Sequence, residues 1–309
     1  MLNKLSSAKL YLDMHGKVVR LVEGFSSKSG AVTIKKHGTV LFEGVDAFPP
    51  EPDFIPNNAG ILKSFVKEQN IRTKKVVLCL GQPGIIARAV KVPMMSPADL
   101  KTHMEMEISD YLPVSSEEYS FDYKVMSVFN EDDRDFFNVM AAAALIKHIE
   151  QCVAIVETAG FKPIAIDIFP NVMWKLFADK YRDTAVVDSG RDGTRLMLCH
   201  GEDLVLYTDI PYQFENQGEE DLSLLTREIS GYLDFFASRH FGKTVDNIYV
   251  TGELSANQNM RLVLEGMLNI PVSPGLQDDD SLELKGNLRG FKEIVSVYAG
   301  NIGLMLREV

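Results

Sequence analysis

The sequence predicts an α/β protein built from two structurally similar halves. An apolar strand at Lys9–Asp13 ends in an aspartate, turns at Gly16 and returns as a second strand, and Thr184–Asp188 repeats this pattern with a turn at Gly190. Amphipathic helices and further strands follow in both parts of the chain. With 309 residues, the chain is long enough to bury two sizeable cores.

The first half is expected to open with four closely spaced strands, separated by glycine-containing turns, at residues 9–13, 17–23, 31–34 and 39–42. Four prolines between residues 49 and 56 cannot continue a strand ladder or a helix interior, so they predict a loop. A helix at Asn58–Glu68 and a buried strand at Val76–Leu80 are expected to follow.

A strong helix start marks the middle of the chain. Ser96 is a good N-cap, Pro97 suits the first helical position, and Asp99 follows three residues after the cap. Apolar residues then recur every three or four positions up to Tyr111, which predicts one buried stripe. The next expected elements are two strands, a helix and a strand, at residues 119–129, 136–141, 145–159 and 163–168.

The second half is expected to repeat the strand pair and then to alternate helices with strands. The expected strands cover residues 184–188, 194–199, 204–207 and 247–250. The expected helices cover residues 222–240, 257–268 and 294–306.

Composition and charge exclude several classes of protein. The formal net charge is −11, and this balance repels a phosphate backbone, whose binding needs clustered Lys and Arg to displace counterions, so nucleic acid is not an expected partner. No stretch reaches the roughly 18 consecutive apolar residues of a membrane span, and the first residues lack the apolar core of a signal peptide. We therefore expect a cytoplasmic protein.

The three cysteines are predicted to be buried thiols. Cys79, Cys152 and Cys199 are widely spaced, and each lies in an apolar run. An odd number of cysteines without close spacing fits neither a disulfide framework nor a metal site.

The two aspartate turns have the composition of a phosphate-binding cleft. A carboxylate at the end of a strand can hold Mg²⁺ through water, and a following glycine lets backbone N–H groups approach phosphate oxygens. One such turn is weak evidence, because turns are generally rich in Asp and Gly. Two turns in matched strand contexts, with a later turn at Thr251-Gly252, indicate a cleft between two domains.

Five other stretches carry a more specific resemblance: Arg88–Pro93, Glu107–Pro113, Arg227–Phe236, Ile248–Gly252 and Gly303–Arg307. They resemble the type IV pilus assembly protein PilM family, which is related to the cell-division protein FtsA and has the actin-like fold. The resemblance spans nearly the whole chain. It implies an actin-like (ribonuclease H-like) duplicated α/β fold with an inserted α+β subdomain in the first half.

The resemblance also implies divisions of the chain. The opening part of the first half covers residues 1–80, and the inserted subdomain covers residues 81–160. The return to the first half, with a connector, covers residues 161–183, and the second half covers residues 184–309. The family's further subdomain would begin after Pro211, where only Tyr212–Asp221 connect strand to helix. The usual subdomain of the second half is therefore predicted to be missing, and this shortened form resembles MshI of the MSHA pilus system.

The resemblance places a nucleotide cleft on seven residues: Asp13, Gly16, Asp188, Gly190, Thr194, Gly252 and Glu253. Two departures from the family pattern weaken that cleft. His15 stands where the pattern has glycine, and Glu253 replaces the usual second glycine with a carboxylate that would repel phosphate. We expect a vestigial cleft with no catalytic residue, no metal and no cofactor.

Other candidate constellations have simpler explanations. His103 and Glu107 lie one helical turn apart but lack a third metal ligand, so a solvated helix face is favoured. The run Asp278–Asp280 is typical of a solvated connector. Several methionines gather at residues 94–106, where they either fill a core or line an adaptable peptide groove.

The resemblance implies a cytoplasmic scaffold of a type IV, MSHA-like pilus machine. Its expected partner is the N-terminal cytoplasmic peptide of a bitopic, PilN-like inner-membrane protein, through which the chain would sit peripherally at the membrane and join the motor and platform complex. The alternative is an ATP-binding, actin-like ATPase with Asp13 and Asp188 on Mg²⁺. A sugar-kinase-like or chaperone-like member of the same superfold is a third class, against which the missing subdomain argues.

Overall fold

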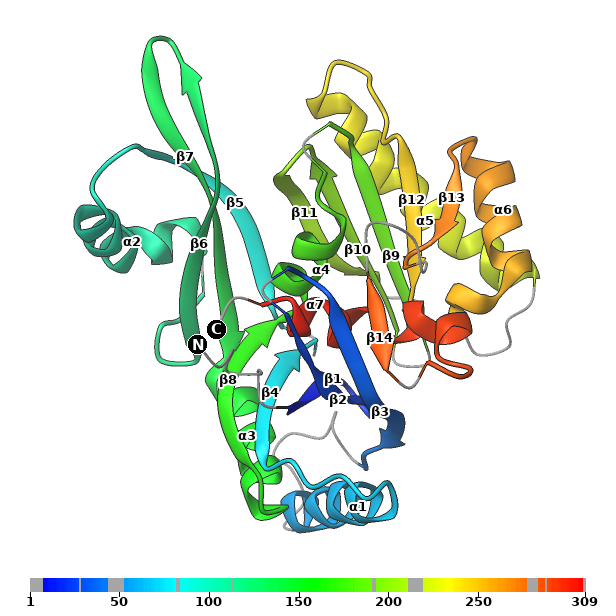
Figure 1. Cartoon of the computed structure of the whole chain (residues 1–309). Coiled ribbons are helices and arrows are strands. Elements are labelled where there is room, and N and C mark those ends of the chain that lie inside the picture. Colours follow the sequence, from blue (N-terminus) through cyan, green and yellow to red (C-terminus); the bar gives the residue numbers. More distant parts are fainter. Residues whose placement is uncertain are drawn as a thin grey trace.

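Two of the sheets in the computed structural model have the same strand order, which confirms the duplicated α/β fold (Figure 1). The structure describes residues 8–27, 29–43, 53–81, 84–112, 114–179, 181–190, 193–210, 219–276, 283–286 and 288–307. Within these residues the first sheet has the order β14-β3-β2-β1-β4-β8 and the second has the order β11-β10-β9-β12-β13. Apart from β14, each sheet places the first strand of its half at the centre, between the second and the fourth.

The first sheet begins as an antiparallel meander, as the spacing of its turns predicts. Its strands are β1 Lys9–His15, β2 Val18–Ser26, β3 Val32–Leu41, β4 Lys75–Leu80, β8 Lys162–Ile168 and β14 Leu284–Gly286. β4 and β8 are parallel to β1 because helices connect them across the sheet. These helices are α1 Phe54–Glu68 and α3 Ile146–Thr158. Their buried faces, including Leu62 and Val156, join the largest core.

The second sheet repeats this plan. Its strands are β9 Thr184–Gly190, β10 Gly193–His200, β11 Asp203–Ile210, β12 Asn247–Thr251 and β13 Val272–Pro274. The helices that connect them are α5 Glu219–Arg239 and α6 Gln258–Leu268. Leu225, Ile229 and Phe236 of α5 are fully buried against the sheet, as the apolar spacing predicts. Only residues 211–218 connect β11 to α5, which is consistent with the predicted shortened second half.

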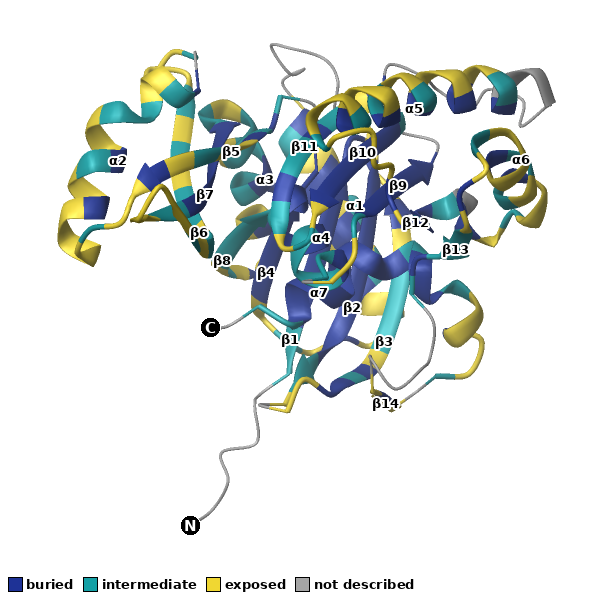
Figure 2. Cartoon of the chain, turned by 90° about the horizontal axis from the view of Figure 1, so that it is seen from above, coloured by how far each residue is buried: buried dark blue, intermediate teal, exposed yellow. Residues whose placement is uncertain are grey.

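A third, smaller sheet forms the inserted part of the first half, to the left in Figure 1. It has the order β5-β7-β6, with β5 Ile86–Pro93, β6 Tyr119–Glu131 and β7 Arg134–Leu145. Helix α2, Pro97–Tyr111, packs on it through Leu100 and Met104. The predicted N-cap is confirmed, since the Asp99 backbone N–H donates to Ser96 Oγ at 3.2 Å. Figure 2 shows that α2 is largely exposed on its outer side.

Short elements join the two larger sheets. Helix α4, Phe169–Phe177, follows β8 directly, and the 3₁₀ helix η2, Lys292–Tyr298, continues into α7, Ala299–Met305. η1, Glu253–Ala256, lies between β12 and α6. Helix α4 contacts β4 and β8 of the first sheet and β9 and β10 of the second, and α7 contacts β1, β2 and β4. The range 184–309, predicted as the second half, also supplies β14 and α7 to the first sheet and its core.

Several boundary predictions were wrong. Helix α1 begins at Phe54 and not at Asn58, so Pro56 lies in its first turn, where no backbone N–H has an intrahelical partner. The segments 31–34 and 39–42 form one strand, β3, because Gly38 is not a turn residue. A Cβ atom at Gly38 would lie 2.2 Å from Phe65 Cζ of α1, so glycine is needed there for close packing of helix on sheet. The single helix expected at residues 294–306 is divided at Tyr298 into η2 and α7.

The cysteine prediction is confirmed, since Cys79, Cys152 and Cys199 are all buried thiols that take part in no disulfide. Within the described ranges, no helix has the length and hydropathy of a membrane span. The aspartate run 278–280 lies outside the described residues.

Candidate functional site

Asp13 lies deep inside the junction of the two halves. The sequence predicts that its strand ends there, but β1 continues to His15 and Asp13 pairs with Arg20 of β2. The turn comes only at Gly16, whose φ is +46°. The Asp13 side chain is 1% exposed, its Oδ1 accepts a hydrogen bond from His15 Nε2 at 2.7 Å, and Arg20 Nη1 lies 3.8 Å from Oδ2.

His15 occupies the space beside Asp13. Its imidazole is fully buried and meets the Phe169 ring edge-on, with the ring centroids 4.3 Å apart. A Cβ atom at Gly81 would lie only 2.2 Å from His15 Cε1. The histidine side chain therefore fills the room that the end of β4 leaves open.

Helix α7 closes over the same carboxylate. A Cβ atom at Gly300 would lie 2.3 Å from Asp13 Oδ2, so only glycine fits where α7 passes Asp13. Burial by itself would raise the pKa of Asp13, but His15, Arg20 and Arg195 together outweigh it and lower the pKa. Asp13 is thus a buried, compensated carboxylate.

The second turn brings together three of the predicted residues, Asp188, Thr194 and Gly252. Thr251 Oγ1 donates to Asp188 Oδ1 at 2.8 Å, and the hydroxyls of Ser189 and Thr194 are 2.7 Å apart. Gly252 has a φ of +79°, and a Cβ atom there would lie 2.6 Å from the carbonyl oxygen of Ser189. The turn after β12 therefore packs directly on the end of β9.

The remaining members of the predicted set lie around this contact. Gly190 ends β9 and pairs with Gly193 of β10. Glu253 opens η1 immediately after Gly252 and is half-buried.

Arg195 is the residue that the sequence analysis missed. It points from β10 into the junction, is 3% exposed, and places Nη1 3.4 Å from Asp188 Oδ2. Its Nε donates to the carbonyl oxygen of Gly81 at 3.1 Å and lies 3.6 Å from Asp209 Oδ1. The available signal was an arginine inside an otherwise apolar strand, since Lys and Arg are almost never fully buried unless paired.

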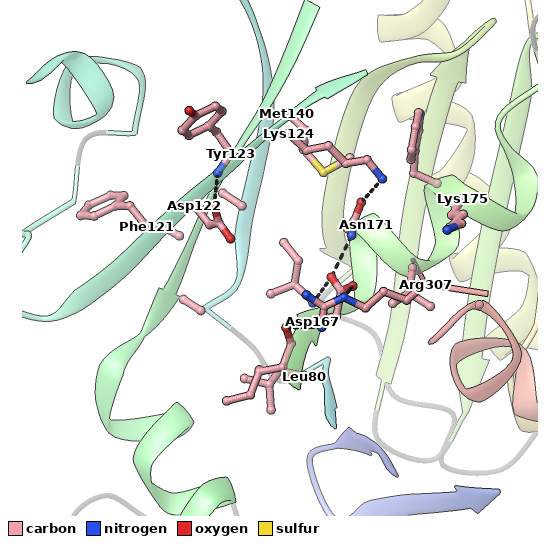
Figure 3. A pocket seen from close by; sticks show the side chains of 18 of the residues that line it. Leu80, Phe121, Asp122, Tyr123, Lys124, Met140, Asp167, Asn171, Lys175 and Arg307 are labelled. Carbon is pink, nitrogen blue, oxygen red and sulfur yellow. Dashed lines mark hydrogen bonds and ion pairs between the residues drawn. The ribbon is translucent and has the colours of Figure 1, made fainter. Parts of the chain in front are cut away.

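A groove of about 790 Å³ lies between the inserted sheet and the first half (Figure 3). One wall comes from β6 and β7, and the other comes from β8, α4 and the C-terminal segment. Its apolar lining includes Leu80, Phe121, Met140, Ala142, Ala144, Ile149, Ile166, Ile168 and Val172.

A chain of polar contacts crosses the groove. Lys124 Nζ donates to Asn171 Oδ1 at 3.2 Å, and Asn171 Nδ2 donates to Asp167 Oδ1 at 2.8 Å. Arg307 Nε lies 3.4 Å from the other oxygen of Asp167 (Figure 3). Lys124 also lies 4.4 Å from the Trp174 ring, a cation–π contact between the inserted sheet and α4.

The methionines of residues 94–106 do not line the groove between the inserted sheet and the first half. Met104 is buried in the core under α2, whereas Met94 and Met106 are exposed and do not line the groove. Met140 of β7 lines it instead.

His103 bonds Tyr111 Oη through Nε2 at 3.1 Å. Over the described parts of the chain, no group of three or more His, Cys, Asp and Glu side chains is placed to hold a metal ion.

Comparisons with known proteins agree with this architecture. A solved PilM-PilN type IV pilus biogenesis complex is similar over 98% of this chain and 99% of that chain, with a TM-score of 0.80 and 18% identity. The ethanolamine utilization protein EutJ from Carboxydothermus hydrogenoformans is similar over 99% and 92%, with a TM-score of 0.51 and 12% identity. No curated protein sequence matches. At these identities the structures establish the actin-like fold.

The family model described as type IV pilus assembly protein PilM matches residues 13–211. This range runs from the first aspartate turn through the inserted sheet to the end of β11, so it includes the groove-lining residues up to Glu202. The chain belongs to the PilM family of type IV pilus assembly proteins.

Proposed function

We propose that this chain is a cytoplasmic scaffold of a type IV pilus machine, and that its groove binds the N-terminal tail of a PilN-like inner-membrane protein. The groove between the inserted sheet and α4 is the observation that carries this proposal. A solved relative of the same fold is a PilM-PilN complex, which supports a partner of the PilN type. Through that partner the chain would lie at the inner face of the membrane and contact the motor and platform.

The geometry of β6 supports an extended peptide as the ligand. Five consecutive residues, Ser120–Lys124, line the groove, although side chains alternate between the two faces of a strand. A run of five consecutive residues is expected where the edge of a strand faces a groove. In the described part of the inserted sheet, β6 is an edge strand. Five residues span about 13 Å, so the tail would add a short strand there, with its apolar side chains on Met140 and Ala142.

Trp174 gives a direct assay for this binding. It is the only tryptophan of the chain and it lines the groove, where Nε1 donates to the Glu202 carbonyl oxygen at 2.7 Å. The ligand is a tail peptide without tryptophan, taken from the PilN-like protein encoded beside this chain. It should change the fluorescence of Trp174 and saturate that change at peptide concentrations below tens of micromolar. No change, and no heat of binding by calorimetry, would contradict the proposal.

Two matched variants place the peptide. Ser120 is exposed on the groove edge of β6, and Ser120→Phe should weaken binding at least tenfold by filling the groove. Met106 is 72% exposed on α2 outside the groove, and Met106→Phe should leave affinity within twofold. Strand addition adds a further test, because single N-methylation along the peptide should weaken binding at alternate positions. Equal effects at all positions would argue against a paired strand.

We also propose that the former nucleotide cleft does not hold Mg·ATP, and that the chain represents the shortened, MshI-like form of the family. His15 fills the space beside Asp13, α7 encloses its carboxylate, and Arg195 pairs with Asp188, so the residues present do not fit a metal-bound nucleotide. The alternative ATPase predicts thermal stabilisation by Mg·ATP of about 2.7 kcal/mol at 100 times Kd. We expect no shift at millimolar nucleotide.

A further inference from the structure

Several buried charges lie around Arg195 at the junction of the two halves. Asp13 is 1% exposed and Asp188 is 5% exposed, so both carboxylates are removed from water. Arg20 forms an ion pair with Asp13, and Arg195 forms one with Asp188, in which Nη1 lies 3.4 Å from Oδ2. A buried carboxylate without a compensating cation is strongly destabilising.

Arg195 belongs to the second half but bonds the first. Its Nε donates to the carbonyl oxygen of Gly81, which follows β4 at the point where the chain leaves the first sheet for the inserted part. Its guanidinium carbon lies 6.0 Å from the centre of the Phe169 ring at the start of α4. One side chain thus touches the second sheet, the first sheet and the helix that lines the groove.

We propose that Arg195 is a built-in cation that takes the place of an external cation between the two aspartate strands and holds the two halves closed without nucleotide. Its effect on Asp13 supports this placement, because Arg195 contributes to lowering the pKa of that carboxyl from the opposite half. Asp209 Oδ1, which lies 3.6 Å from Nε, is a further anionic neighbour of Arg195. The cleft is therefore bridged by the chain's own guanidinium.

The geometry requires arginine rather than any positive charge. The guanidinium reaches Asp188 through Nη1 and Gly81 through Nε, two acceptors on different sheets. Lysine has a single ammonium nitrogen, so it cannot contact the Asp188 carboxylate and the Gly81 carbonyl oxygen through two separate nitrogens as the planar guanidinium does. Arg195→Lys should therefore retain the charge and lose the bridge.

The experiment measures the distance between the halves. Lys63 of α1 and Leu262 of α6 are exposed, whereas the native cysteines are buried, so spin labels at Lys63→Cys and Leu262→Cys report on one helix of each half. We expect one narrow distance distribution, unchanged by Mg·ATP. Arg195→Ala should broaden it and lower Tm by at least about 6 °C. Guanidinium at tens of millimolar should restore the narrow distribution and the Tm of Arg195→Ala. It should change neither quantity in the control variant Arg88→Ala, which removes an exposed arginine.

Three results would overturn the proposal: a narrow distribution in Arg195→Ala, no rescue by guanidinium, or a distance that Mg·ATP changes in the unsubstituted chain. If Arg195→Ala does not fold, Arg195→Met is compared with Arg195→Met combined with Asp188→Asn. The double variant should melt higher, because it removes the buried charge that the single variant leaves unpaired. An equal or lower Tm would refute the bridge. These measurements use no tail peptide, so their outcome is separate from that of groove binding.

Discussion

Alanine at Gly300 should destabilise this protein, although alanine is the best helix former. Gly300 lies in α7, and a Cβ atom there would meet Asp13 Oδ2 at 2.3 Å and Asp13 Cγ at 2.6 Å. Real Cβ contacts are not this short, so the carboxylate or the helix must move. The carboxylate cannot move freely, because His15 Nε2 holds its other oxygen at 2.7 Å.

The expected magnitude follows from three contributions. Overpacking of a tight core costs about 1–3 kcal/mol. Loss of a hydrogen bond to a charged group costs about 1.5–3 kcal/mol. Replacement of glycine by alanine in a helix returns about 1 kcal/mol. We therefore expect Gly300→Ala to lower the free energy of unfolding by about 1.5–5 kcal/mol.

The matched control is the same substitution in α5. At Gly231 an added Cβ atom would meet nothing within 4 Å, and the residue is exposed. Gly231→Ala should raise the free energy of unfolding by about 0.5–1 kcal/mol, because only helix propensity changes. Urea denaturation with a common m-value measures both variants. If Gly300→Ala is as stable as Gly231→Ala, then α7 does not pack against the Asp13 carboxylate and there is free space beside it.

Further predictions concern the same core. The groups facing Asp13 are His15, Arg20, Arg195 and Cys79. Because the pKa of Asp13 is lowered in the folded state, ionised Asp13 stabilises the fold above its unfolded pKa of about 3.9. This stabilisation is lost as the pH falls through the folded pKa. Asp13→Asn should therefore flatten the acid limb of the stability profile, and an unchanged acid limb would contradict the assignment. Burial raises the pKa of the Cys199 thiol to about 12, so a thiol reagent at pH 8 should label Cys199 and Cys79 only on unfolding; labelling faster than unfolding would refute this. Gly38→Ala should cost about 1–3 kcal/mol by meeting Phe65, and the cost should fall when combined with Phe65→Leu. Additive effects of that pair would exclude the contact.

Much of the fold could be predicted because local signals agree with the tertiary structure. The capped start at Ser96 and the apolar face of α5 gave element boundaries close to those observed. The repeated strand with an aspartate near its end predicted the duplication, which the two equal strand orders confirm. Helix α4 escaped prediction, because a short apolar run after a strand has no period to distinguish it.

The candidate site was harder to predict, since its properties depend on contacts between distant residues. Gly38 was assigned to a turn from sequence, whereas the structure uses it for packing against Phe65. The sequence drew attention to His15 beside Gly16, but it could not show that the imidazole bonds Asp13 two residues earlier. Arg195 directly follows Thr194 of the second predicted turn, but only its tertiary contacts with Asp188 and with the Gly81 carbonyl oxygen after β4 give it a role.

The central claim is that the groove along β6, and not the aspartate cleft, receives the physiological ligand. Hydrogen–deuterium exchange of the full chain with the tail peptide, and separately with Mg·ATP, tests it most directly. We predict that the peptide slows exchange along Ser120–Lys124 and in α4, while Mg·ATP leaves β1 and β9 unchanged. Protection of β1 and β9 by nucleotide, with none along β6 from the peptide, would contradict the account.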